Sequence, residues 1–183
     1  MQGDDVRESI RAELEQTRLR FHALTGSLTA DQWRTSSRNP AWSNGQLLFH
    51  MMFAFMLVPS LFRILRFFSR RPDRSSAAFA RTLDLGTPLF HFVNALGPRI
   101  GARLYGPRRI DAKYDRVQAA VLRRLDAVRS DEWDRSMHYP PHWDPAFTDS
   151  MSFEALFRYP VAHFNRHRSY IATGDALPAD RPG

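Results

Sequence analysis

Apolar side chains recur every three or four positions along much of the chain, which is the spacing that buries one face of an α-helix. Ser43, with Gln46 three residues later, predicts a capping box at a helix start. The four amphipathic stretches that we expect to be helical cover, in chain order, about residues 5–27, 45–68, 111–128 and 152–171. The pattern therefore predicts an all-α protein, a four-helix bundle with an extra segment between the second and third helices.

The extra segment, residues 69–109, has the least regular pattern. Residues 70–76 read as a solvated turn, 79–83 as a short helical turn, and 87–98 as an apolar hairpin or short helix. The second helix is apolar on every side, so the aromatic residues of the extra segment are predicted to cover it. A reversible contact with anionic lipid is the alternative, because arginines flank the apolar patch.

A short phrase occurs twice, once after the first expected helix and once after the third. Residues 28–33 (LTADQW) are similar to residues 128–133 (VRSDEW). Each phrase precedes an irregular loop with proline and tryptophan, and then an apolar helix that starts at a serine and carries a histidine. We therefore expect two helix-loop-helix halves related by approximate two-fold symmetry, which places the second and fourth helices side by side.

Composition restricts the chemistry that the chain can perform. The sequence has no cysteine, so disulfides, thiolate metal sites and a cysteine nucleophile are excluded, and any metal must be held by nitrogen or oxygen atoms. The length of 183 residues allows one full core, and we expect residues 1–183 to form a single domain. The net charge of +7 favours acidic partners. Nucleic acid is not expected among them, because the arginines are scattered and no nucleic-acid-binding motif is present.

Neither a leader nor a membrane span is expected. Residues 1–15 are polar and already helical in pattern, unlike a signal peptide. The longest apolar run, residues 47–62, is interrupted by His50 and Pro59 and is shorter than the roughly 20 residues that a membrane-spanning helix needs. We therefore expect a cytoplasmic protein.

Two histidines with metal-ligand spacing lie in the fourth expected helix. His163 and His167 are four residues apart, which on a helix is a rotation of about 40° and a rise of about 6 Å, so both rings leave one face. That face is otherwise apolar and is predicted to point into the core. His50, within the apolar second helix, is the natural third ligand because an unpaired buried imidazole is costly. The alternative is that each ring makes only a local hydrogen bond.

The loop before the fourth helix carries further candidate groups. His138, His142 and Asp144 lie within residues 137–144, near one end of the expected bundle. Each of them is a candidate catalytic acid or base, or a further metal ligand. The alternative is that these histidines are exposed in a turn with prolines on both sides.

Taken together, these motifs resemble the DinB-like (DinB/YfiT) superfamily of four-helix-bundle metalloproteins. The features that carry the resemblance are the tryptophan-serine start of the second helix with a histidine seven residues after the serine, the Asp-x-Trp phrase, and the terminal histidine pair. Their residues, apart from the phrase, are Trp42, Ser43, His50, His163 and His167. The resemblance covers about residues 5–173, within which residues 69–109 look like an insertion.

This resemblance implies an up-down-down-up bundle, a divalent metal held by the three histidines, and frequent homodimers. Characterised members of the superfamily include thiol transferases and isomerases that use low-molecular-weight thiols such as mycothiol or bacillithiol. Three neutral imidazoles leave positions on a divalent cation open to water or to a substrate thiol. Zinc is the first expectation, and nickel, iron and manganese are the alternatives.

The sequence therefore predicts a metal-dependent enzyme of the thiol S-transferase or hydrolase type. A metal so bound lowers the pKa of water or stabilises a thiolate, either of which supplies the reacting group. The expected partner is a small-molecule substrate, and the positive net charge favours an anionic thiol. A non-catalytic bundle that is stabilised by metal or senses a ligand is one alternative, and a peripheral membrane protein is another.

Overall fold

Helices make up nearly all the regular structure in residues 2–172, which are the residues that the computed structural model describes. The elements, with η marking short 3-10 helices, are α1 (Gln2–Gly26), α2 (Asn44–Phe68), α3 (Asp73–Leu85), α4 (Thr87–Asp126), β1 (Ser136–His138), η1 (Pro141–Trp143), β2 (Ser150–Ser152), α5 (Phe153–His167) and η2 (Arg168–Tyr170). The two short strands pair antiparallel with each other. The prediction of an all-α protein is therefore confirmed.

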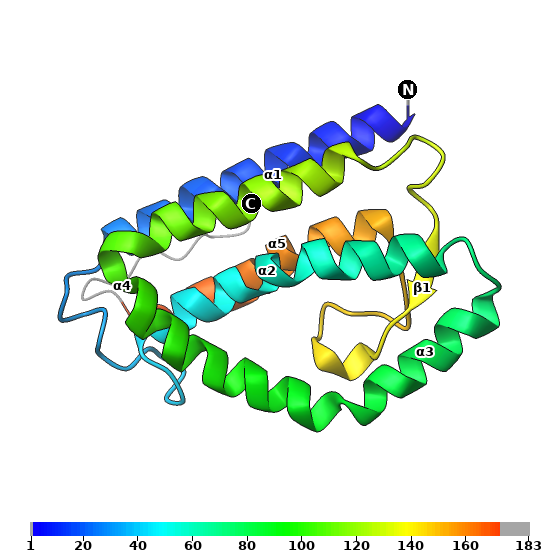
Figure 1. The fold of residues 1–183 in the computed structure, drawn as a ribbon. Coiled ribbons are helices and arrows are strands. Elements are labelled where there is room, and N and C mark those ends of the chain that lie inside the picture. Colours follow the sequence, from blue (N-terminus) through cyan, green and yellow to red (C-terminus); the bar gives the residue numbers. More distant parts are fainter. Residues whose placement is uncertain (1, 173–183) are drawn as a thin grey trace.

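Four helical segments pack as a bundle. α1 lies beside the second half of α4, and α2 lies beside α5 (Figure 1). α1 and α5 run in one direction, and α2 and the second half of α4 run in the other (Figure 1). This is the up-down-down-up order that the resemblance implied. Because α2 packs against both α4 and α5, it is the central element of the core.

The core is built from the apolar stripes of these helices, and α2 contributes buried residues on almost every side. The capping box at its start is confirmed, since the Ser43 side chain accepts from the Gln46 N–H and the Gln46 side chain accepts from the Ser43 N–H. The largest fully buried side chains of the core include Phe21, Phe55, Tyr114, Phe153, Phe157 and Phe164. All four bundle helices therefore share one core.

Judged by length and composition alone, α2 could also cross a membrane. The helix has 25 residues, close to its expected bounds, and extends beyond the apolar run of residues 47–62, so the length of that run does not exclude a membrane span. Inside the fold, however, 61% of its most apolar window is buried. The core helix of a bundle passes the same test of length and composition, and the burial of α2 accounts for its apolar sequence.

The extra segment is more helical than expected. Instead of a hairpin or short helix, α3 is followed by α4, whose first half runs from Thr87 to a break at Gly106. Gly106 has a φ of 51°, a left-handed value that glycine adopts at little cost, and Pro107 suits the first turn of the second half. The third bundle helix therefore starts at this break, a few residues before its expected position.

The first half of α4 covers α2, which confirms the prediction that the aromatic residues of the extra segment cover that helix. Gly101 lies so close to Phe49 that a Cβ atom there would be 2.2 Å from the ring, and Tyr105 stacks on the same ring with 6.1 Å between centroids. α3 adds Phe79, which stacks on Phe68 at 4.6 Å. The large apolar residues of α4 that stay exposed are Leu89, Phe92, Val93, Leu96, Ile100 and Leu104. A lipid contact of this surface stays a sequence-based prediction.

The repeated phrase marks similar local structure in both halves of the chain. Ser36 pairs with Ser43 in an isolated bridge, and Ser136 pairs with Ser152 between β1 and β2. In each half the second serine is the N-cap of the following apolar helix, α2 or α5. The second loop is longer than the first, and it contains η1 and Asp144. The two halves therefore share a loop design, but only the second offers this extra carboxylate.

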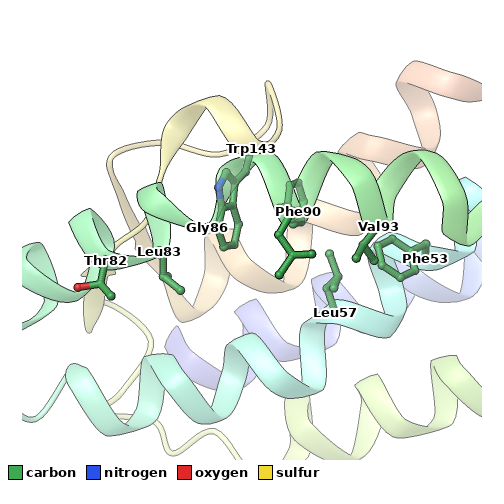
Figure 2. Close-up of a pocket in the computed structure, with 9 residues that line it drawn as sticks. Phe53, Leu57, Thr82, Leu83, Gly86, Phe90, Val93 and Trp143 are labelled. Atoms are coloured by element: carbon green, nitrogen blue, oxygen red, sulfur yellow. The ribbon is translucent and has the colours of Figure 1, made fainter.

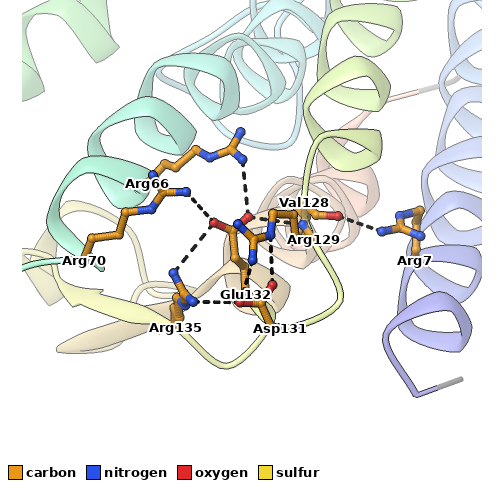
Figure 3. Close-up of polar contacts among 8 residues, drawn as sticks. All are labelled: Arg7, Arg66, Arg70, Val128, Arg129, Asp131, Glu132 and Arg135. Carbon is orange, nitrogen blue, oxygen red and sulfur yellow. Dashed lines mark hydrogen bonds and ion pairs between the residues drawn. The ribbon is translucent and has the colours of Figure 1, made fainter.

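One buried carboxylate in the second phrase joins the end of α2 to the loop after α4 (Figure 3). Glu132 is 1% exposed and accepts from Arg70 Nη2 at 2.9 Å and from the Arg129 backbone N–H at 3.2 Å. Burial alone would raise the pKa of Glu132, but these hydrogen bonds lower it. Beside this cluster, Arg7 of α1 donates to the Val128 carbonyl at 2.7 Å (Figure 3). Charged groups thus close this end of the bundle.

At the opposite end, Asn44 ties the chain after α5 to the start of α2. Its side chain is fully buried. Its Nδ2 donates to the carbonyls of Gln32 at 2.9 Å and Ala172 at 3.0 Å, and its Oδ1 accepts from the Ala172 N–H at 2.9 Å. These three bonds fix the two helices that carry the candidate ligands at the end where the ligands lie.

Replacing Asn44 with alanine is expected to lower the free energy of unfolding by about 2–3 kcal/mol, because three partly buried backbone groups lose their partner. Equilibrium unfolding in urea at neutral pH measures this change. Asn39→Ala is the matched control, since the Asn39 side chain accepts one solvent-exposed bond, from the Ala41 N–H. Equal destabilisation by the two substitutions would contradict the role assigned to Asn44.

Candidate metal centre

Three histidines from two helices meet inside the bundle. His50 lies on α2, and His163 and His167 lie one turn apart on α5. One nitrogen atom of each ring lies within 4.8 Å of those of the other two. The ring centroids are 4.7 Å apart for His50 and His163, 4.9 Å for His50 and His167, and 4.6 Å for His163 and His167. The structure thus brings together the three residues that the sequence named as metal ligands.

The local sequence explains why these rings point to one place. Ser152 caps α5, and the four-residue spacing then puts His163 and His167 on the side that faces α2. Because α2 packs along α5 in the opposite direction, its first half meets the last half of α5 (Figure 1). His50 and His163 are 3% and 4% exposed, and the Trp42 ring lies 4.3 Å from that of His50. The group is therefore enclosed on most sides, and only His167 is partly exposed.

Each ring keeps one buried nitrogen atom without a hydrogen-bond partner among residues 2–172. These atoms are His50 Nδ1, His163 Nε2 and His167 Nδ1. Buried polar atoms are nearly always paired, and leaving one unpaired costs about 1–3 kcal/mol. A single cation bound between the rings would satisfy all three rings together. The residues present therefore fit a metal ion.

Burial also keeps the rings of His50 and His167 neutral, as metal ligands must be. It is the largest cause that lowers the pKa of His50 to about 3 and that of His167 to about 4, and the nearby His163 ring lowers both as well, because two adjacent rings resist being charged together. At neutral pH both rings therefore carry a free lone pair.

A carboxylate on the far side of His163 fixes the tautomer of that ring. Asp144, which is 7% exposed, accepts from the His163 Nδ1–H at 2.6 Å, from Arg166 Nη1 at 3.0 Å and from the Ala146 N–H at 2.8 Å. Burial alone would raise the pKa of Asp144, but these three hydrogen bonds lower it below its ordinary value. An ionised carboxylate can only accept, so the proton of His163 lies on Nδ1. The buried Nε2 atom then keeps its lone pair free for a metal.

Two residues that support the group were not foreseen from the sequence. The side chain of Asn94, in the first half of α4, lies close enough to His50 to raise the pKa of that ring against the effect of burial. It lies in the extra segment, whose pattern held no signal for it. Arg166 follows His163 by three residues on α5 and donates to Asp144. The three-residue spacing was a usable signal for Arg166, because residues so spaced are neighbours on a helix.

The other two candidates of the loop have different partners. His138 Nε2 lies 3.1 Å from an Asp73 oxygen, and His142 Nε2 lies 3.0 Å from an Asp84 oxygen. Both carboxylates belong to α3, so these pairs attach the loop to α3 and do not join the histidine group. Of the three residues considered for acid–base roles, only Asp144 contacts a ligand histidine, and it does so as an ionised acceptor. A loop has no regular period, so the sequence could not show which way the side chains of His138, His142 and Asp144 point.

The donor set determines which ions fit. Three imidazole nitrogens, with no thiolate, suit a divalent transition metal such as zinc, nickel or iron. Because the Asp144 carboxylate is engaged by His163 and Arg166, it orients a ligand and is not itself a member of the group. Three protein ligands leave at least one coordination position for water or substrate.

A family model described as the DinB superfamily matches residues 13–171 of the chain. No curated protein and no solved structure matches the chain. The matched part includes the three histidines and Asp144, and also Asn94 from the extra segment. Every residue of the site described above therefore lies within the match.

Proposed function

The chain belongs to the DinB superfamily, and from this premise we propose that it is a metal-dependent enzyme. In this proposal His50, His163 and His167 hold a divalent transition metal, with zinc as the first candidate. The observation that carries it is the meeting of three histidines that each keep a buried ring nitrogen without a partner among the described residues. The reaction is a thiol S-transfer or a hydrolysis.

The residues of the site have separate roles in such a reaction. When bound, the metal lowers the pKa of water toward about 7 or stabilises a thiolate. Asp144 holds the His163 ring in the tautomer that a ligand needs, and Arg166 helps to keep Asp144 ionised. Trp42 shields His50 from water, whereas the partly exposed side of His167 gives access from solvent.

A bundle that is stabilised by metal without catalysis is the second candidate. The nearly complete burial of His50 and His163 favours it, since structural metal sites are closed and catalytic sites keep an open position. For such a protein, added metal would raise the melting temperature while no substrate turned over.

Metal analysis and a thiol-transfer assay on the same preparation test the proposal. Protein produced with added zinc is expected to retain about one equivalent after gel filtration. Transfer of mycothiol or bacillithiol to a small electrophile, and hydrolysis of small esters, are then followed by chromatography before and after chelation. Activity that is lost on chelation and restored by zinc, nickel, iron or manganese supports the enzyme. Less than about a tenth of an equivalent of metal would overturn it, and full metal content without turnover would favour the second candidate.

A further inference from the structure

A cavity of about 300 Å³, open to solvent and with the exposed Leu89 and Val93 at its rim, lies between α2, α3, the first half of α4 and η1. Its walls include Phe53, Leu57, Leu83, Phe90, Val93 and Trp143 (Figure 2). The Trp143 indole N–H already donates to Thr87 Oγ1 at 2.9 Å, so this polar atom is engaged within the protein. The cavity is at the small end of the range for ligand sites, and its lining suits an uncharged group.

Two helix faces lead from this cavity to the histidine group. On α2, Leu57, Phe53 and His50 follow one another at steps of four and three residues, so they lie on one face. On α4, Phe90 and Asn94 are four residues apart and also share a face. α2 and the first half of α4 run in opposite directions (Figures 1 and 2). Going back along α2 from Leu57 to His50 and forward along α4 from Phe90 to Asn94 therefore means moving in the same direction, from the cavity toward the start of α2.

The two faces meet at that end, because the Asn94 side chain lies beside the His50 ring. A third connection comes from the loop before α5. Trp143 stacks on Phe90 with 4.5 Å between centroids, and the next residue, Asp144, hydrogen-bonds to His163. None of the three histidines lines the cavity, but Phe53, Phe90 and Trp143 lie within four residues of His50, Asn94 and Asp144, so the cavity is adjacent to the histidine group.

We propose that this cavity binds the apolar part of the substrate, an alkyl chain or a single aromatic ring, while the reactive polar end faces His50, His163 and His167. The proposal rests on the proposed metal-dependent function and narrows its substrate class. The extra segment supplies Leu83, Phe90 and Val93, so it makes the cavity as well as covering α2. A substrate without an apolar group would leave this surface unused.

Two hydroxamates with the same metal-binding head test the proposal. Isothermal titration of the zinc-loaded protein is expected to show octanohydroxamate binding at least about tenfold more tightly than acetohydroxamate, since each buried methylene can contribute about fourfold. Leu57→Trp and Val93→Trp fill the cavity from opposite walls. Each is expected to abolish the gain from the longer chain while leaving acetohydroxamate binding unchanged.

Leu104→Trp is the matched control, because Leu104 lies on the same half of α4 but is 64% exposed and outside the cavity. The Leu104→Trp variant should still bind octanohydroxamate more tightly than acetohydroxamate. Equal binding of the two hydroxamates to metal-loaded protein would overturn the cavity proposal and leave the metal-dependent function standing. The cavity proposal would also be overturned if both cavity variants still bound octanohydroxamate more tightly than acetohydroxamate. If the protein retains no metal and binds neither compound, the proposed function itself fails, and this inference with it.

Discussion

Replacing His163 with alanine is expected to reduce the zinc retained by the purified protein from about one equivalent to less than about a tenth. His163 is the ligand histidine whose tautomer is fixed by a carboxylate, since Asp144 accepts its Nδ1–H. Without it only His50 and His167 remain in the group, and two imidazoles are fewer than the three protein ligands of known catalytic zinc sites. Mass spectrometry of the metal after gel filtration gives the stoichiometry, and circular dichroism shows whether the helices persist.

His142→Ala is the matched control for this experiment. The His142 side chain is 49% exposed and pairs with Asp84, so its loss is expected to leave the zinc content unchanged. If His163→Ala keeps its helices and retains as much zinc as His142→Ala, the three-histidine site is excluded. Loss of zinc from both variants would mean that the measurement reports general destabilisation and not the loss of a ligand.

The ligand histidines could be predicted because a helix fixes the direction of its side chains. The spacing of His163 and His167 needs only helical geometry, and the position of His50 in an apolar helix needs only the cost of burying an unpaired ring. The repeated phrase, with its serine N-caps, predicted that α2 packs beside α5, as the structure shows. Each step depends on sequence that is local to one helix or loop.

The extra segment was harder to predict because its proline residues suggest breaks. Pro88 lies in the first turn of α4, where its missing N–H costs nothing, and Pro98 is buried within the helix. The helix is favoured there by covering the apolar side of α2, which is a tertiary effect that the local pattern does not contain. The contact between Asn94 and His50 depends on this packing, so no reading of the local sequence could have found it.

Asp144→Asn is expected to weaken zinc binding by about 10–100-fold while leaving the helix content unchanged. The amide has the size of the carboxylate but no charge, and its NH₂ group can donate to His163 Nδ1. The ring proton would then lie on Nε2, the atom that otherwise offers its lone pair to the metal. Competition with a chromophoric chelator measures the zinc affinity of the variant and of the unmodified protein.

Two further variants separate this orienting role from general stabilisation. Asp149→Asn removes a carboxylate that contacts His138 and not a ligand histidine, so zinc affinity should not change. Arg166→Gln keeps the bond between Asp144 and His163 but removes a hydrogen-bond donor that helps to hold the pKa of Asp144 low, so its effect should be intermediate. Equal affinities for all three variants would contradict the role of Asp144. The expected order follows from how strongly each substitution weakens the acceptor that holds the proton of His163 on Nδ1: Asp144→Asn replaces the acceptor, Arg166→Gln only weakens its support, and Asp149→Asn leaves it unchanged.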